Sequence, residues 1–577
     1  MGRLLTNELS KVFHRRSCRI MALLMLVIVI GTPVLSKLTY VMFDKPRDTT
    51  EKYYQIMYEQ EKGARKEMYK AVLEDIAELK KNGIDIDGWR KDYFNYYLRY
   101  ANTITALDLI QQGRDIEEVS GGIVYSPLIQ RGLDGEYKFL HITEEHGLSG
   151  AGLEEVSFKK EDIPKYKEEV QVYYNKAKQL LYAGKAEFAR LRAEEYNRKI
   201  ADIKEQIKEL GASESDIRER EAMELAIVVY EGAVKCWEAF KTCDEENEEW
   251  ITELEELMSD LAQFGAYRAS AFDKEYFFSE DDRKYHFYRL VEFERTQAFD
   301  SYEKYTEFMN EAKEDFRRAV DMIVYSAEKQ APTAASFNAS FKSAKYALDL
   351  SLTTGLYTVM SFCIFLSAVI MGSEYTTGSI RLLLIRPQPR WKILLSKLLS
   401  LWIFTAAALI VIYTITPLTT VLIYGGGDLE TKITVFKNGA IAAVSPLQNA
   451  IHKGLLGFIS MFGISMLTFM LSLIIKKGTI SAAVGIMVFG FGQSIAELAR
   501  VALYRMPFLK YTVLPYIMNL EYAEYNPLDR FLMSFDYTPV SAEYGLELST
   551  GIVIIMLLTA IFVILSFVIF DRQQIKN

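Results

Sequence analysis

The residues best suited to a chemical role lie in a short polar hairpin, residues 372–397, between two long apolar stretches. An acidic side chain opens this hairpin, a glycine follows four residues later, and a short apolar helix ends before a proline. Basic side chains then lead into the next apolar stretch, and a compact, rigid hairpin of this kind can transmit force. The residues that carry this hypothesis are Glu374, Gly378, Arg381, Arg386, Pro387, Arg390 and Lys397. The same spacing also suits an ordinary basic loop at a membrane surface.

The sequence lacks the motifs of the common catalytic sites. No G-x-x-x-x-G-K-[ST] segment occurs, and the pair Gly83 and Gly88 is followed by Trp89 where a phosphate-binding loop needs lysine. A Gly-x-Ser-x-Gly elbow and a convincing cluster of metal ligands are also absent from the sequence. We therefore expect that this chain is not an enzyme and holds no cofactor or metal of its own.

Six apolar stretches are long enough to cross the hydrocarbon core of a membrane, which takes about 20 residues. They lie at 20–43, 350–371, 394–424, 455–475, 480–502 and 551–570. The first follows a basic segment with Lys11 and Arg19, which would also suit a secretory signal peptide. The apolar run continues through Val41 without a small-residue cleavage site, which favours an uncleaved anchor. The sequence thus predicts an all-α membrane protein with six transmembrane helices.

Lysine and arginine in the short loops indicate the orientation of these spans. The N-terminal segment, the polar hairpin, Lys476 with Lys477, and the C-terminal tail are basic and fall on one side by alternation. Both termini are therefore expected in the cytoplasm of a protein of the plasma membrane. Gln493, Glu497 and Arg500 form a polar stripe near the outer end of the fifth span. This stripe is either an interface cluster or part of a substrate path.

A large acidic insert, residues 44–348, separates the first span from the other five and is expected to be extracellular. Its apolar residues recur at intervals of three and four, as in long, packed, coiled-coil-like helices. A break at Gly211 predicts an antiparallel helix hairpin, and residues 113–152 form a glycine-rich loop or small β island with strands at 123–125 and 137–142. An acidic insert has the wrong charge for binding nucleic acid, and four cysteines are too few for a disulfide framework.

The polar hairpin resembles the loop after the second span in permeases of ABC transporters of the ABC-2 type. The shared order is E-x-x-x-G-[ST]-x-[RK]-x-L-L-x-x-P-x-x-R-x-x-x-[LI]-x-x-K, which runs here from Glu374 to Lys397 and includes Ser379. The apolar face of residues 1–19, with Leu5, Leu9, Val12 and Phe13, is similar to the amphipathic helix that precedes the first span in this family. The resemblance covers residues 1–43 and 349–577. It does not include the insert, because typical members of this family have only a short loop at that position.

This resemblance implies that the hairpin is a coupling helix that docks on a separate ATPase subunit, which would bind the ATP. Six spans would make half a transporter, so a second permease subunit is implied, in a homodimer or a heterodimer. The resemblance favours export of a peptide, an antibiotic or another small substrate. The implied domains are a cytoplasmic amphipathic helix (1–19), a first transmembrane helix (20–43), an extracytoplasmic helical domain (44–348) and a five-helix transmembrane domain (349–577) with an external re-entrant segment at 504–549.

A second class of function fits the same architecture. Membrane receptors and secretion-accessory proteins also combine one span, a long helical external part and five more spans. In such a protein the insert would bind its partner directly, and no ATPase would be needed. The match of the polar hairpin to the permeases favours the transporter.

Overall fold

A computed structural model describes most of the chain, with two larger gaps at 262–301 and 518–545. The described ranges are 2–41, 50–113, 128–131, 137–141, 154–261, 302–333, 344–517 and 546–573, without residues 15, 40, 63, 212, 213, 249, 253, 256, 259, 260, 386, 387, 431, 438, 504 and 505. Packing divides the chain into two units, which are described separately. The membrane unit comprises Met1–Lys45 and Lys274–Asn577, and the insert unit comprises Pro46–Asp273.

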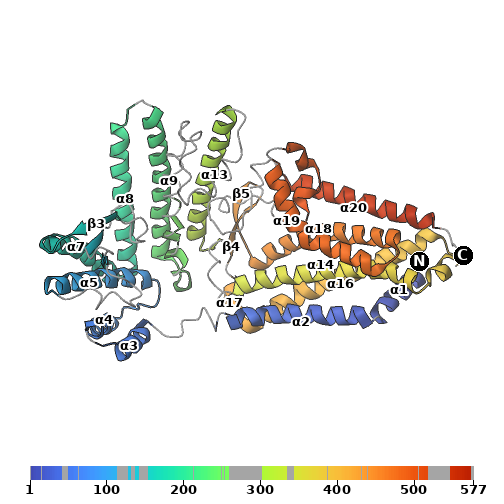
Figure 1. The fold of residues 1–577 in the computed structure, drawn as a ribbon, viewed down its shortest axis with the longest axis horizontal. Helices are drawn as coiled ribbons and strands as arrows, with labels where there is room; N and C mark the ends of the chain where they lie inside the picture. The colour runs from blue at the N-terminus through green and yellow to red at the C-terminus, as the bar shows by residue number, and fades with distance from the viewer. Residues whose placement is uncertain are drawn as a thin grey trace. The chain divides into compact units, whose positions relative to one another are not determined.

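The membrane unit is a bundle of long helices that run side by side (Figure 1). Its helices are α1 (Gly2–His14), α2 (Arg16–Thr39), α13 (Tyr302–Glu328), α14 (Ala344–Thr376), α15 (Ile380–Ile385), α16 (Arg390–Tyr424), α17 (Gly427–Glu430), α18 (Pro446–Ile475), α19 (Gly478–Ala502) and α20 (Leu548–Asp571). Short 3₁₀ helices follow α19 at Pro507–Tyr511 and Leu514–Tyr516. They fall in the expected re-entrant segment, of which residues 518–545 lie outside the described part.

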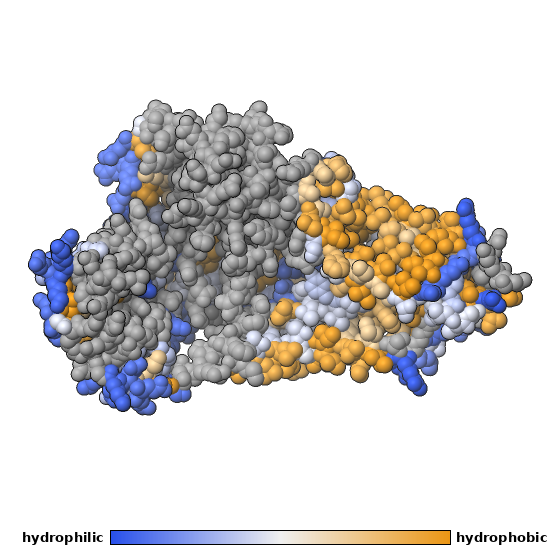
Figure 2. Space-filling model, in the orientation of Figure 1, coloured by the Kyte–Doolittle hydropathy of each residue, from blue (hydrophilic) through white to orange (hydrophobic). Residues whose placement is uncertain are grey.

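Five of the described helices are long and apolar enough to cross a membrane, so the chain is an integral membrane protein. They are Cys18–Thr39, Ala347–Thr376, Arg390–Tyr424, Pro446–Ile475 and Leu548–Asp571. The fifth predicted span, 480–502, coincides with α19, whose apolar part, Gly478–Gly492, is shorter. A sixth crossing therefore stays a prediction. The outward side chains of these helices are largely apolar, as Figure 2 shows for one face of the bundle.

Helix α14 lies at the centre of the bundle and packs against α2, α16, α18 and α19. Its buried residues, such as Val359 and Ile364, join one core with Leu394 and Ile412 of α16 and Phe469 of α18. Lipid tails are as apolar as these side chains, so close backbone contact through small residues contributes much of the packing energy between such helices. At one crossing, a Cβ atom on Gly372 would lie 2.2 Å from the Cα atom of Gly478. The end of α14 and the start of α19 therefore touch backbone to backbone.

A two-stranded antiparallel hairpin lies between α16 and α18, in a segment for which the sequence analysis predicted no strand. It consists of β4 (Ile433–Lys437) and β5 (Ala440–Val444), with Gly439 at φ +78° in the turn. The Thr434 N–H donates to the Pro332 carbonyl at 3.0 Å, and the Thr434 hydroxyl donates to the Ala331 carbonyl at 2.6 Å. These bonds fasten the chain just after α13 to the hairpin, so α13 belongs to the membrane unit.

The insert unit is also mostly helical. It contains α3 (Thr50–Gln60), α4 (Ala64–Lys81), α5 (Lys91–Gln111), α7 (Ile163–Tyr182), α8 (Lys185–Glu209) and α9 (Glu214–Thr242), with strands β1 (Ile129–Arg131), β2 (Tyr137–His141) and β3 (Glu154–Phe158). Helices α8 and α9 form the hairpin predicted around Gly211. The three strands form an antiparallel sheet in the order β1-β2-β3.

The strands and the helix packing of the insert unit agree in part with the predictions from the sequence. The strand expected at 137–142 is present as β2, whereas 123–125 lies outside the described residues. Strands β1 and β3 were missed by the sequence analysis. All four cysteines are free thiols, as their number and spacing indicated. Long helices pack in pairs, but a coiled-coil geometry stays a prediction.

The contact between Gly372 and Gly478 gives a first prediction. Gly372→Ala forces two backbones apart, and overpacking of this kind costs about 1–3 kcal/mol. We expect a lower Tm for the purified protein in detergent. The matched control is Gly490→Ala in α19, where a Cβ atom meets nothing within 4 Å. The control should keep or raise the Tm, because alanine favours a helix; equal Tm values for the two variants would contradict the close crossing.

Candidate functional site

A network of four charges, three of them buried and Lys11 partly exposed, joins three helices beneath the polar hairpin. Lys397 of α16 is fully buried, and its Nζ lies 2.9 Å from Glu374 Oε1 of α14 and 2.7 Å from Glu8 Oε2 of α1. Lys11 Nζ lies 3.1 Å from Glu8 Oε1 and 3.1 Å from Glu374 Oε1. Two ammonium groups thus alternate with two carboxylates, and the network is neutral. Buried charges persist when they are paired in this way.

The helix periodicity explains how α1 contributes two members. Glu8 and Lys11 are three residues apart, so they share one face of the helix, and Val12 is buried beside them. Burial alone would lower the pKa of Lys11, but the carboxylates of Glu8 and Glu374 raise it above the ordinary value. The ammonium group of Lys11 therefore stays charged at neutral pH. Helix α1 is thus fastened to the bundle through its polar face as well as through its apolar residues.

The end of α14 is shaped by a glycine and a serine that the sequence analysis singled out. Gly378 adopts φ +70°, a left-handed conformation that commonly ends a helix and favours glycine. Its N–H donates to the Tyr375 carbonyl at 3.2 Å. The Ser379 hydroxyl donates to Glu374 Oε2, so the same carboxylate is held from the hairpin side. The turn therefore directs the chain into α15 while it orients Glu374 toward Lys397.

The short helix α15 has three exposed side chains among those that the structure describes, whereas Ile380 is half-buried against the core. Leu382 is 68% exposed and Ile385 is 70% exposed, and Arg381 beside them is exposed too. Arg386 and Pro387 lie outside the described residues. Trp391, just after the hairpin turn, is also exposed. Two exposed apolar side chains thus lie beside a cation on the surface of this hairpin.

Arg390 is bound within the chain. Its guanidinium donates to the Asp571 carbonyl at 2.5 Å and to the Gln573 carbonyl at 2.8 Å. The Tyr375 hydroxyl donates to Gln573 Oε1 at 2.6 Å, so the end of α14 meets the same segment. These bonds satisfy carbonyls at the C-terminal end of α20. Arg390 therefore ties the start of α16 to α20.

The predicted polar stripe on α19 lies outside the side chains that the structure describes. Gln493, Glu497 and Arg500 lie within the helix Gly478–Ala502, and their side chains are outside the described part of the structure. A role for these residues in a substrate path stays a prediction.

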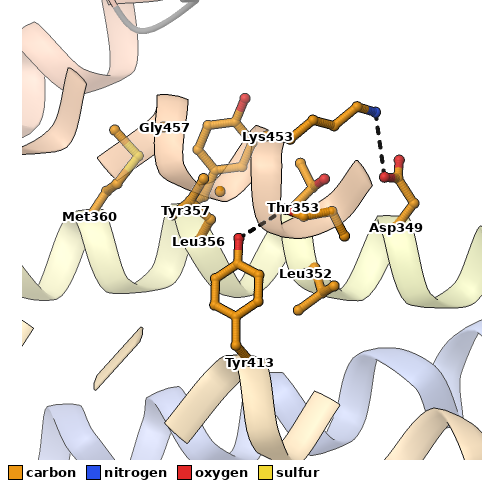
Figure 3. Close-up of a pocket in the computed structure, with 11 residues that line it drawn as sticks. Asp349, Leu352, Thr353, Leu356, Tyr357, Met360, Tyr413, Lys453 and Gly457 are labelled. Carbon is orange, nitrogen blue, oxygen red and sulfur yellow. Dashed lines mark hydrogen bonds and ion pairs between the residues drawn. The ribbon is translucent and has the colours of Figure 1, made fainter. Parts of the chain in front are cut away.

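A second polar site lies at the other end of the bundle, between α14, α16 and α18 (Figure 3). Asp349 Oδ1 and Lys453 Nζ are 3.4 Å apart, and Tyr413 donates its hydroxyl to the Ala450 carbonyl at 3.2 Å. The adjacent cavity has a volume of about 20 Å³, enough for about one water. Tyr413 fits because Gly454 has no side chain: a Cβ atom there would overlap the tyrosine oxygen. Sequence analysis missed this site because Asp349 and Lys453 are far apart in the chain.

Comparison with known proteins gives two matches without an assigned activity. Residues 323–575 match the model of a family described as "Protein of unknown function (DUF2705)". The chain is similar to "Uncharacterized protein YhcI" of Bacillus subtilis (strain 168), with 23% identity over 267 residues, or 46% of this chain and 78% of that protein. No solved structure matches this chain. The family match includes Glu374 and Lys397 but not α1.

Burial of Lys397 yields the prediction for this site. Lys397→Met leaves two carboxylates buried with one remaining cation, and removal of one partner of a buried ion pair costs about 3–5 kcal/mol. We expect a marked fall in the Tm of the purified full-length protein. The matched control is Lys392→Met on the same helix, where the side chain is half-buried and the loss should be below about 1 kcal/mol. Equal effects of the two substitutions would argue against the buried network.

Proposed function

We propose that this chain is the permease subunit of an ATP-driven transporter of the ABC-2 type, with the polar hairpin as its coupling element. ATP would bind to a separate ATPase subunit that docks on α15. The observation that carries the proposal is the combination of an exposed apolar surface, Leu382 and Ile385, with a buried charge network directly behind it. A docking helix on such a support can move as one body with its neighbours.

Force applied to α15 would reach the membrane along two paths. Ser379 and Glu374 connect the hairpin to α14, and Lys397 connects it to α16 and, through Glu8, to α1. Breaking one of these buried, charged contacts would cost several kcal/mol of free energy. Moving the joined helices together leaves the contacts intact and therefore costs less. Closure of two ATPase chains would thus shift α14 and α16 together and alternate access to a path between two permease subunits.

The proposed topology has six spans, of which α19 is the fifth along the chain, and both termini in the cytoplasm of the plasma membrane. Helix α1, helix α15 and the end of α20 lie at one end of the bundle (Figure 1). This end also carries Arg19, Arg381, Lys477 and Arg572, as expected for a cytoplasmic surface. The insert, residues 44–348, would then be extracellular and could meet substrate or partner before release.

The cargo and the partner subunits follow from the family resemblance. Export of a peptide, an antibiotic or another small substrate is the proposed activity, with a second permease subunit completing the path. The assembly would contain two permeases and two ATPases in a lipid bilayer. The receptor or secretion-accessory function remains the alternative, in which the insert acts without an ATPase.

Substitution of the exposed surface of α15 tests this proposal. Full-length tagged protein is purified from its native host in mild detergent, and the co-purifying chains are identified. We expect an ATPase subunit with a nucleotide-binding motif in stoichiometric amount. Leu382→Glu combined with Ile385→Glu should reduce its recovery at least tenfold, because a docking surface cannot bury two new charges without cost. The variant should keep the wild-type Tm, because both side chains are exposed.

Lys477→Glu is the matched control, since this exposed residue lies in another loop at the same end of the bundle. It should retain the ATPase. Recovery of the ATPase that is equal in all three proteins would contradict docking on α15. Recovery of an extracellular or cell-wall protein in place of any ATPase would favour the alternative function.

A further inference from the structure

Gln573, which follows the end of α20 by two residues, contacts three other helices of the membrane unit. Its side-chain oxygen accepts a hydrogen bond from the Tyr375 hydroxyl of α14 at 2.6 Å. Its side-chain nitrogen donates to the Leu473 carbonyl of α18 at 3.3 Å. Its backbone carbonyl accepts from the Arg390 guanidinium at the start of α16, at 2.8 Å. One residue therefore joins the ends of α14, α18 and α20 to the start of α16.

Two hydrogen bonds at this point satisfy backbone groups that a helix leaves open. The last four carbonyls of a helix have no partner within it, and Leu473 and Asp571 hold such carbonyls near the ends of α18 and α20. Gln573 donates to the first, and Arg390 donates to the second at 2.5 Å. The positive charge of Arg390 also lies at the negative end of the α20 dipole. We call Tyr375, Arg390, Leu473, Asp571 and Gln573 the C-terminal clasp.

The side chain at position 573 needs both an acceptor and a donor. An amide carries both, whereas a carboxylate keeps the acceptor and lacks the donor. Gln573 and Tyr375 are half-buried, so water replaces their bond incompletely when either group is lost. Gln573→Ala therefore removes both side-chain bonds, and Tyr375→Phe removes the bond between the two residues.

The clasp and the charge network hold different faces of the end of α14. Glu374 and Tyr375 are consecutive in this helix, so their side chains point about 100° apart. Glu374 meets Lys397 of α16, and Tyr375 meets Gln573. The Tyr375 carbonyl also accepts from the Gly378 N–H at 3.2 Å, in the turn that leads into α15. The charge network thus connects the hairpin to α1 and α16, and the clasp connects it to α18 and α20.

We propose that Gln573 is a positioning residue of the polar hairpin: through Tyr375 it sets the orientation of α15 and passes a displacement of the hairpin to α18 and α20. This inference rests on the proposed function. Without the clasp, a displacement would reach these two helices through apolar contacts, and packed helices can slide past one another. The segment after α20 is thus part of the coupling element, although Gln573 lies 198 residues after Tyr375.

ATP hydrolysis by the purified complex tests the coupling role. The complex is recovered from the native host through the tagged full-length chain, as wild type and as Gln573→Ala. We expect equal recovery of the ATPase, because Leu382 and Ile385 are unchanged. The kcat for ATP hydrolysis should be about threefold higher with an unchanged KM for ATP, because closure of the ATPase then displaces fewer helices. A general loss of structure lowers both recovery and kcat, so an unchanged or lower kcat overturns the proposal.

Tyr375→Phe removes the same bond from its other side and should give the same rise in kcat. The double variant should show no further rise, because the two side chains form one contact. The matched control is Gln448→Ala, at an exposed glutamine near the start of α18, and it should hydrolyse ATP as wild type. If Gln573→Ala fails to fold, Tyr375→Phe decides. Rises that multiply in the double variant contradict the shared contact.

Hydrogen exchange of the isolated full-length chain in detergent separates failure of this inference from failure of the proposed function. Gln573→Ala should speed exchange of the amides in 375–385 about fivefold, while α1 exchanges as in wild type because Glu8 and Lys397 still hold it. Unchanged exchange in 375–385 overturns the clasp even when no ATPase is recovered. An equal rise in all helices would show general destabilisation and also overturn the positioning role. A local rise without any recovered ATPase would overturn the proposed function, and the coupling role with it, while the contact itself stands.

Discussion

The structure of the membrane unit depends on one buried ammonium group. Lys397 is enclosed among transmembrane helices, where an unpaired charge costs several kcal/mol. Two carboxylates from distant parts of the chain, Glu8 and Glu374, share it, and Lys11 neutralises the remaining charge. Each member is needed by the others, so α1, α14 and α16 are held in one arrangement.

The same network and the contacts around it hold the polar hairpin in a fixed position on the bundle. Ser379 and the left-handed turn at Gly378 fix the hairpin to Glu374, and Arg390 fixes its other arm to the end of α20. Among the described residues of the hairpin, Leu382 and Ile385 of α15 remain exposed. The contact of Gly372 with Gly478 adds a close crossing to α19 at the same end. Motion at the hairpin is thus shared by several helices.

The sequence predicted the part of this arrangement that is local in the chain. Spacing within the hairpin singled out Glu374, Gly378 and Lys397, and helix periodicity predicted most helices that the structure describes. Glu8 was missed because its ion-pair partner Lys397 lies on another helix, and a partner far along the chain leaves no local pattern. The pair Asp349 and Lys453 and the strand pairing of β4 with β5 likewise depend on tertiary contact.

The most direct test of the account is a double-mutant cycle between α1 and α16. Glu8→Leu, Lys397→Met and their combination are compared by the free energy of unfolding of the purified protein. If both charges belong to one buried network, the combined loss should fall short of the sum of the single losses by about 1–3 kcal/mol. Losses that add within about 0.5 kcal/mol would show that α1 is independent of the network and would contradict the account.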